Sequence, residues 1–127
     1  MKVLLDTHVL LWFLNGDKKL SKQQNEFIES SKNLKFVSIA SLWEISIKLS
    51  LNKLRLPLDL KSFIQLIDQN GFLILPIELE HIIAISDLEF IHRDPFDRIL
   101  IAQSLAEKLT LLTNDEDIVK YRVKTIQ

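Results

Sequence analysis

The sequence predicts a three-layer α/β/α domain around a central parallel sheet of four to five strands. Short, uniformly apolar segments recur along the chain, and segments with helical spacing of apolar residues separate them. A length of 127 residues, with 47% hydrophobic and 26% charged side chains, suits a single domain over residues 1–127. Strands without polar alternation are typical of parallel sheets whose two faces are both covered by helices.

The first half of the chain alternates strands with helices. Apolar segments at residues 2–5 and 35–37 are each followed by apolar residues at helical spacing. The first helix is predicted to end at Asn15-Gly16, because glycine readily adopts the left-handed conformation that closes a helix. A polar helix over residues 21–31 follows it.

The helix after the second strand begins near Ser38 or Ser41, either of which can act as its N-cap. Leu42, Ile45 and Leu49 lie on one face of this helix, which predicts that this face is buried. The break after this helix is marked by Pro57.

The second half of the chain continues the alternation. A helix over residues 58–68 is followed by a third strand over 72–75, and Pro76 stops that strand. The remaining predicted elements are a helix over 77–88, a strongly apolar helix over 95–108, a fourth strand over 109–112 and a fifth over 123–126.

The amino-acid composition excludes several kinds of site and protein. The chain has no cysteine, which removes disulfides and thiolate zinc sites. Its apolar segments are too short to span a bilayer and its start does not resemble a signal peptide, so we expect a cytoplasmic protein that does not enter the membrane. Sixteen basic and seventeen acidic residues give a net charge of −1, which permits RNA binding without indicating it.

Three acidic residues follow predicted strands, just outside the carboxyl ends where ligands commonly bind in parallel α/β sheets, and the helix of a fourth can start at the same edge. Asp6 ends the first strand, and Asp115 follows the fourth. Glu44 lies about two turns into the helix after the second strand, and Asp97 lies in the first turn of the helix before the fourth. We therefore predict that these four acids meet at one edge of the sheet.

A cluster of carboxylates needs a counterion, because like charges a few ångströms apart otherwise take up protons. Mg²⁺ or Mn²⁺ suits this role, since hard cations prefer carboxylate and water oxygens. A water bound to such an ion can hydrolyse a phosphodiester.

Each acid also has a purely structural interpretation. Asp6 can cap the first helix, and the segment from Ser41 to Glu44 fits a capping box. Asp94-Pro95-Phe96-Asp97 resembles an ordinary helix start, with Asp94 as the cap. Residues 114–117 resemble another helix start. Spacing by itself thus supports an acidic edge on an α/β domain and leaves its function open.

Four blocks of sequence resemble those of PIN-domain proteins, and of VapC-like toxins in particular. They are Leu4-Leu5-Asp6-Thr7-His8-Val9-Leu10-Leu11-Trp12, Ser41-Leu42-Trp43-Glu44-Ile45, His92-Arg93-Asp94-Pro95-Phe96-Asp97-Arg98 and Leu112-Thr113-Asn114-Asp115. The blocks occur in the family's order and span nearly the whole chain. The resemblance implies a metal-dependent endoribonuclease, the toxin of a type II toxin–antitoxin pair.

The resemblance also assigns roles to individual residues. It implies that the catalytic and metal-binding carboxylates are Asp6, Glu44, Asp97 and Asp115, with Mg²⁺ or Mn²⁺ as the cofactor. Thr7 and Thr113 are expected to supply orienting hydroxyls, and Asp117 is at most an accessory acid. The implied partners are an RNA substrate, a cognate antitoxin protein and a second copy of the chain. Trp12, Phe13 and Trp43 are candidates for the antitoxin contact, the alternative being ordinary core positions.

Basic residues near the acids suggest a path for RNA. We predict that Arg93 and Arg98, which flank the acidic turn, contact phosphates, the alternative being solvated side chains. The same two interpretations apply to Lys48, Lys53 and Arg55. The three histidines, His8, His81 and His92, lack the spacing of zinc ligands and are read as local hydrogen-bonding groups.

Two rival functions remain. A phosphatase with a nucleophilic aspartate at a strand end is disfavoured, because His8 stands where a second aspartate is expected two residues after Asp6. The other rival is a non-catalytic PIN-like module that binds RNA or a protein, and only a nuclease assay excludes it.

Overall fold

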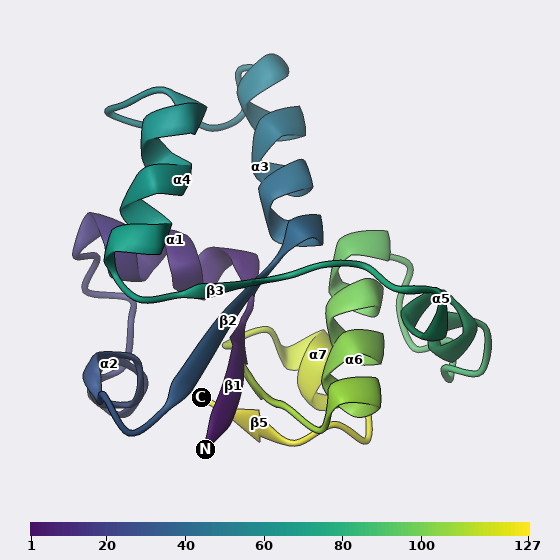
Figure 1. Cartoon of the computed structure of the whole chain (residues 1–127). Helices are drawn as coiled ribbons and strands as arrows, with labels where there is room; N and C mark the ends of the chain where they lie inside the picture. Colours follow the sequence, from purple (N-terminus) through teal and green to yellow (C-terminus); the bar gives the residue numbers. More distant parts are fainter.

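A five-stranded parallel sheet forms the centre of the computed structural model, which describes residues 1–127 (Figure 1). The strands lie in the order β3-β2-β1-β4-β5. Their bounds are β1 Lys2–Leu5, β2 Leu34–Ser38, β3 Leu73–Leu75, β4 Thr110–Leu112 and β5 Thr125–Ile126. The fold class predicted from the sequence is confirmed, and the sheet has the larger of the two predicted numbers of strands.

Helices cover both faces of this sheet, as uniformly apolar strands require. Figure 1 shows α1, α2 and α4 on one side and α5, α6 and α7 on the other. The helices are α1 Thr7–Asn15, α2 Lys22–Glu29, α3 Ile39–Ser50, α4 Leu60–Gln69, α5 Leu79–Ser86, α6 Pro95–Glu107 and α7 Glu116–Val119. None of these helices is long and apolar enough to cross a membrane.

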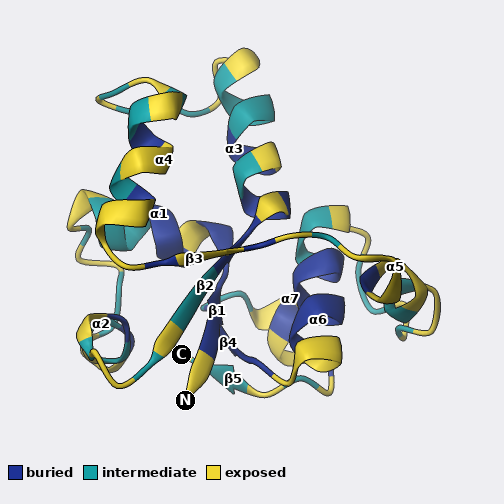
Figure 2. Cartoon of the chain, in the orientation of Figure 1, coloured by how far each residue is buried: buried dark blue, intermediate teal, exposed yellow.

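Alternate side chains of β1 enter two separate cores. Val3 and Leu5 pack in a cluster that includes Ile45 and Phe63, on the face covered by α1 and α4. Leu4 points to the opposite face and packs in a second cluster with Leu100 of α6. Val3, Leu4 and Leu5 are fully buried, so β1 is the central element of the three layers. Figure 2 shows similar burial along much of α6.

Several helix ends follow the local signals in the sequence. Gly16 has a φ of 64° and closes α1, in the left-handed region that glycine adopts at little cost. Ser21 and Gln24 form a capping box at the start of α2. At α3 the two predicted alternatives are resolved, because Ser38 caps the helix by accepting a hydrogen bond from Ala40 N.

Other boundaries differ from the prediction by a few residues. α4 begins at Leu60 rather than at residue 58, because the Asp59 side chain accepts a hydrogen bond from Ser62 N and caps the helix there. α5 begins at Leu79, where the Glu78 N–H donates to the ring of His81. β5 is limited to Thr125–Ile126.

The strand order creates a switch point between β1 and β4. The chain leaves β1 toward β2 and β3, and then returns to the other side of β1 as β4. Open parallel sheets bind ligands in the crevice outside the carboxyl ends of strands at such a point. Asp6 follows β1 at this crevice and Thr113 follows β4, so the topology brings residues from the two ends of the sequence together.

Candidate functional site

Asp6 lies at the switch point and serves two structural purposes at once. Its Oδ1 accepts hydrogen bonds from the backbone N–H groups of His8 at 2.6 Å and Val9 at 3.3 Å, which caps α1. Its Oδ2 accepts a hydrogen bond from the Thr113 hydroxyl at 2.6 Å. Burial raises the pKa of Asp6 above its ordinary value, although these hydrogen bonds lower it. The structural interpretation of Asp6 as a cap is therefore correct and is compatible with a site at the same carboxylate.

Thr113 connects Asp6 to Asp115. While its hydroxyl donates to Asp6, the same oxygen accepts a hydrogen bond from Asp115 N at 3.0 Å. Asp115 in turn caps α7 by accepting from Asp117 N at 2.8 Å. A hollow of about 210 Å³ opens beside these residues and is lined by Asp6, His8, Trp12, Asn114 and Asp115. Two of the four predicted acids thus share one cavity.

Asp97 belongs to the same electrostatic environment. It lies half-buried in the first turn of α6. The pKa of Asp97 is raised to about 7, mainly by burial and also by the charges of Asp94, Asp115 and Asp6, while the hydrogen bond with His92 lowers it. Asp97 is therefore close enough to Asp6 and Asp115 for their charges to raise its pKa, while a metal site made of the four acids stays a prediction.

Glu44 approaches this edge from α3 and is already paired with a cation. Its side chain is almost fully buried, and its Oε2 lies 3.0 Å from Nζ of Lys48, one turn further along the helix. Because Ser38 caps α3, Glu44 is not part of a capping box at Ser41, and that structural interpretation is wrong. Glu44 lines a separate cavity of about 410 Å³ together with Lys48, Arg93, Asp94 and Phe96, among others.

The chemistry of the four predicted ligands fits a hard divalent cation. All four predicted ligands offer carboxylate oxygens, and the raised pKa of Asp97 reflects in part the crowding of negative charge. No three acidic or histidine side chains converge closely enough to hold one ion between them. Mg²⁺ usually keeps several waters and binds one or two carboxylates directly, so such a spread set suits it better than zinc.

The predicted accessory residues differ in their positions. The Thr7 hydroxyl donates to Ser41 Oγ at 2.9 Å, which joins the start of α1 to α3 rather than contacting an acid. Asp117 is exposed and its carboxylate pairs with Lys120 at 3.2 Å. Of the predicted accessory side chains, Thr113 alone contacts a candidate ligand directly.

Arg98 requires a correction. We predicted that it contacts RNA phosphates, but its side chain is buried against the loop that precedes α6. Its Nη1 donates to the carbonyl of Glu89 at 3.1 Å and to the Tyr121 hydroxyl at 3.0 Å, and its guanidinium lies 4.5 Å from the Phe90 ring centroid. The guanidinium is therefore engaged in contacts that stabilise the fold. Arg93 is exposed and lines the cavity of Glu44, so its predicted role is still available.

The sequence did not reveal the contacts of His92. Its Nε2 lies 3.0 Å from Asp97 Oδ2, and its Nδ1 lies 2.8 Å from the hydroxyl of Tyr121. The interpretation of His92 as a hydrogen-bonding group is correct, but Tyr121 is 29 positions away and no local pattern predicts that pair. The ion pair of Glu44 and Lys48 could have been predicted from the sequence, because ion pairs form on helices between residues four positions apart.

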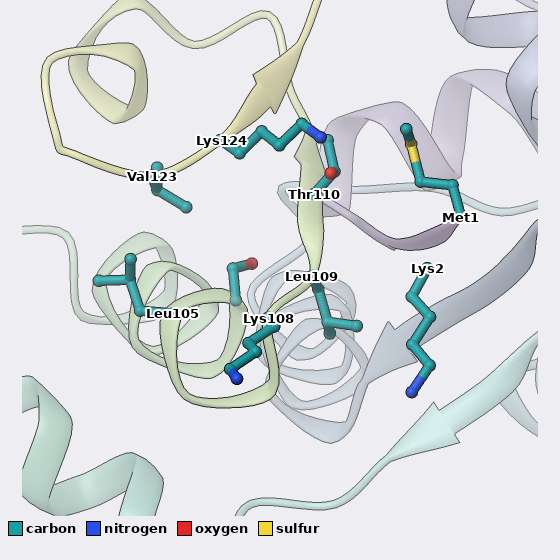
Figure 3. Close-up of a pocket in the computed structure, with 9 residues that line it drawn as sticks. Met1, Lys2, Leu105, Lys108, Leu109, Thr110, Val123 and Lys124 are labelled. Carbon is teal, nitrogen blue, oxygen red and sulfur yellow. The ribbon is translucent and has the colours of Figure 1, made fainter.

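Two further hollows lie away from the acids. One, of about 350 Å³, lies at the amino ends of β1 and β4 and contains Lys2, Lys108 and Lys124 among its lining residues (Figure 3). The other, of about 220 Å³, is almost entirely apolar and lies between Trp43 of α3 and the residues Ile82 of α5 and Phe96 of α6. Trp43 is more than half exposed there, whereas Trp12 and Phe13 are partly buried against the core.

The sequence matches the model of a known protein family. Residues 3–124 match the family model described as the PIN domain. No curated protein sequence matches the chain.

Several solved structures share the fold at low sequence identity, and three of them are described below. The structure of VapBC2 from Rickettsia felis, bound to a DNA fragment from the promoter, matches with a TM-score of 0.74 and 16% identity over 99% of this chain and 98% of that one. A toxin–antitoxin complex from Klebsiella pneumoniae matches with a TM-score of 0.68 and 15% identity, over 98% of this chain and 96% of that one. FitAcB from Neisseria gonorrhoeae matches with a TM-score of 0.62 and 18% identity, over 100% of this chain and 97% of that one.

Proposed function

The chain belongs to the PIN-domain family, and on this premise we propose that it is a metal-dependent endoribonuclease that acts as the toxin of a toxin–antitoxin pair. The observation that supports the proposal is that Asp6 and Asp115 line one cavity at the switch point, and that the charges of both contribute, after burial, to the raised pKa of Asp97. Clustered carboxylates of this kind are a common arrangement for binding a divalent cation beside a phosphate group.

The proposed ligands of the cation are Asp6, Glu44, Asp97 and Asp115, directly or through water. When bound, Mg²⁺ or Mn²⁺ supplies an activated water and neutralises charge on the phosphodiester. Thr113 positions the carboxylate of Asp6 and, through its oxygen, the backbone of Asp115. Lys48 neutralises Glu44 and is near enough to the surface to move aside or to contact a phosphate.

RNA is the proposed substrate, with Arg93 as one of its contacts. Arg93 is exposed on the rim of the cavity that Glu44 and Asp94 line, beside the proposed cation site. Lys53 and Arg55 are also exposed, in the segment that follows α3. Arginine and lysine at such positions can bind phosphates without reading the sequence of the bases.

We also propose a protein antitoxin as the partner and a homodimer as the assembly. The likeness to the toxin–antitoxin complex from Klebsiella pneumoniae supports the antitoxin. The apolar hollow at Trp43 lies beside the acidic edge, since Phe96, which lines it, contacts the Trp43 ring at a centroid distance of 5.3 Å and adjoins Asp97 in the chain. Co-purification of the chain with the product of a short neighbouring gene is the test of this partner.

The decisive experiment on the activity compares the purified protein with its Asp6→Asn variant. We expect RNA cleavage in Mn²⁺ or Mg²⁺, no cleavage in EDTA, and loss of cleavage in the variant. Asparagine keeps an oxygen that can cap α1, so the variant should retain its fold, as circular dichroism would show. Unchanged cleavage by a nuclease-free preparation of the variant would refute the proposal, and binding of RNA without cleavage would favour a non-catalytic module.

A further inference from the structure

The Tyr121 hydroxyl is the centre of a hydrogen-bond network behind Asp97. It is buried and receives hydrogen bonds from Arg98 Nη1 at 3.0 Å and from the backbone N–H of His92 at 3.1 Å. A hydroxyl has two lone pairs and one hydrogen. The two donors fill the lone pairs, so the oxygen has only its own hydrogen left to give.

The direction of that remaining hydrogen follows from the two nearby acceptors. His92 Nδ1 lies 2.8 Å from the Tyr121 oxygen, whereas the carbonyl oxygen of His92 lies 3.5 Å away. The shorter contact is the better hydrogen bond, so the hydroxyl donates to Nδ1. A neutral imidazole that accepts at Nδ1 carries its proton on Nε2.

Nε2 is the ring nitrogen that contacts Asp97, at 3.0 Å from Oδ2. The protonated Nε2 therefore donates to the carboxylate, and a directed series of hydrogen bonds runs from Arg98 through Tyr121 and His92 to Asp97. His92 is the only protein group that donates to this carboxylate, and Oδ1 of Asp97 has no protein partner. One carboxylate oxygen is thus fixed, while the other is free to face a ligand.

We propose that His92 is a positioning residue, which Tyr121 holds in the Nε2–H tautomer so that Asp97 presents Oδ1 to the divalent cation. The part that concerns the cation rests on the proposed function, whereas the tautomer and the orientation of Asp97 do not. Groups that orient metal ligands through a hydrogen bond commonly change metal affinity about tenfold to a hundredfold when they are removed. Arg98, which we first expected at the RNA, anchors the far end of this series instead.

The alternative is that His92 and Tyr121 only fasten the loop before α6, and a matched pair of variants separates the two roles. The amide nitrogen of glutamine reaches approximately the position of Nε2, so His92→Gln can still donate to Asp97. The shorter side chain of His92→Asn ends near the position of Nδ1 and cannot reach Asp97. Both variants remove the imidazole from the loop, so a fastening role predicts equal effects in the two.

The experiment measures Mn²⁺ affinity by electron paramagnetic resonance of free Mn²⁺, for the full chain and both variants. We expect His92→Gln to bind within about threefold of the unchanged protein and His92→Asn to bind about tenfold or more weakly. Equal affinity in the two variants, or no measurable binding of Mn²⁺ by the unchanged protein, would overturn the proposal. Thermal unfolding of the metal-free proteins reports any general loss of stability.

Nitrogen-15 NMR of the histidine rings tests the tautomer with neither metal nor RNA. At pH 8 we expect His92 to show a protonated Nε2 and an unprotonated Nδ1, and Tyr121→Phe to lose this preference. A protonated Nδ1 in the unchanged protein would overturn the proposal. If the tautomer and the Mn²⁺ affinities are as expected but no RNA is cleaved, only the proposed activity is refuted. If RNA is cleaved but the two variants bind Mn²⁺ equally, only the proposed role of His92 is refuted.

Discussion

The ammonium of Lys48 lies 3.0 Å from Glu44 Oε2, so one of the proposed cation ligands already has a positive partner. Glu44 is 6% exposed, and a carboxylate this far from water requires a positive partner. A divalent cation that uses Glu44 must share it with Lys48 or displace the ammonium. The lysine and the metal are therefore expected to compete.

The first prediction concerns this competition. Lys48→Gln should raise the affinity for Mn²⁺ severalfold, because it leaves Glu44 without its internal counterion, and should lower the melting temperature of the metal-free protein. Isothermal titration calorimetry and thermal scans in EDTA measure the two effects. Lys120→Gln is the matched control, since Lys120 pairs with Asp117 at 3.2 Å on the exposed surface and should change neither quantity appreciably. A weaker affinity in Lys48→Gln would show that the lysine supports the site.

The second prediction concerns the bond from Thr113 to Asp6. Thr113→Val keeps the shape of the side chain but removes the donor to a buried carboxylate and the acceptor for Asp115 N. We expect the free energy of unfolding to fall by about 1–3 kcal/mol in urea titrations, the usual effect of leaving a buried polar group unsatisfied. Thr7→Val removes a bond to the neutral hydroxyl of Ser41 and should cost less. The opposite ranking would contradict the importance of the Asp6 contact.

The third prediction is the pH dependence of stability in the absence of metal. The pKa of Asp97 is about 7 in the folded protein, against an ordinary 3.8. Between these values the folded state binds more protons than the unfolded state, so the free energy of unfolding should decrease as pH rises from about 4 to about 7. Burial raises the pKa of Asp6 as well, which contributes in the same direction. Urea titrations in EDTA across this range measure the slope.

Asp97→Asn provides the control for this slope. Asparagine cannot ionise, so the variant should be more stable than the unchanged protein at pH 8 and should show a shallower dependence on pH below 7. A variant that is clearly less stable at pH 8, with the slope unchanged, would mean that Asp97 is not the group responsible.

The fourth prediction separates the two acids of the turn before α6. Asp94 caps the helix by accepting hydrogen bonds from Phe96 N and Asp97 N, and asparagine retains the oxygen that does this. Asp94→Asn should therefore keep most of the metal-dependent cleavage, whereas Asp97→Asn should lose about tenfold to a hundredfold. Single-turnover cleavage at saturating Mn²⁺ measures both. The reverse order would assign the cation to Asp94.

Much of this fold was predictable because its signals are local. The β1 strand over residues 2–5 was predicted with its observed bounds, and the ends of α1 and α2 follow Gly16 and Ser21. Asp94 was also recognisable as a cap, because a cap, a proline and an acid within four residues define the start of α6. Each of these features depends on the conformation of a few consecutive residues, which the sequence determines directly.

The contacts that organise the site were decided only by tertiary structure. Thr113 and Asp6 are 107 positions apart, and they meet because β1 and β4 are neighbours in the sheet. Arg98 is of a residue type that often contacts phosphates, yet its side chain lies inside the protein and donates to the Tyr121 hydroxyl. A residue's type fixes which bonds it can form, but its partners are set by the packing of helices and strands, which brings distant segments within hydrogen-bonding distance.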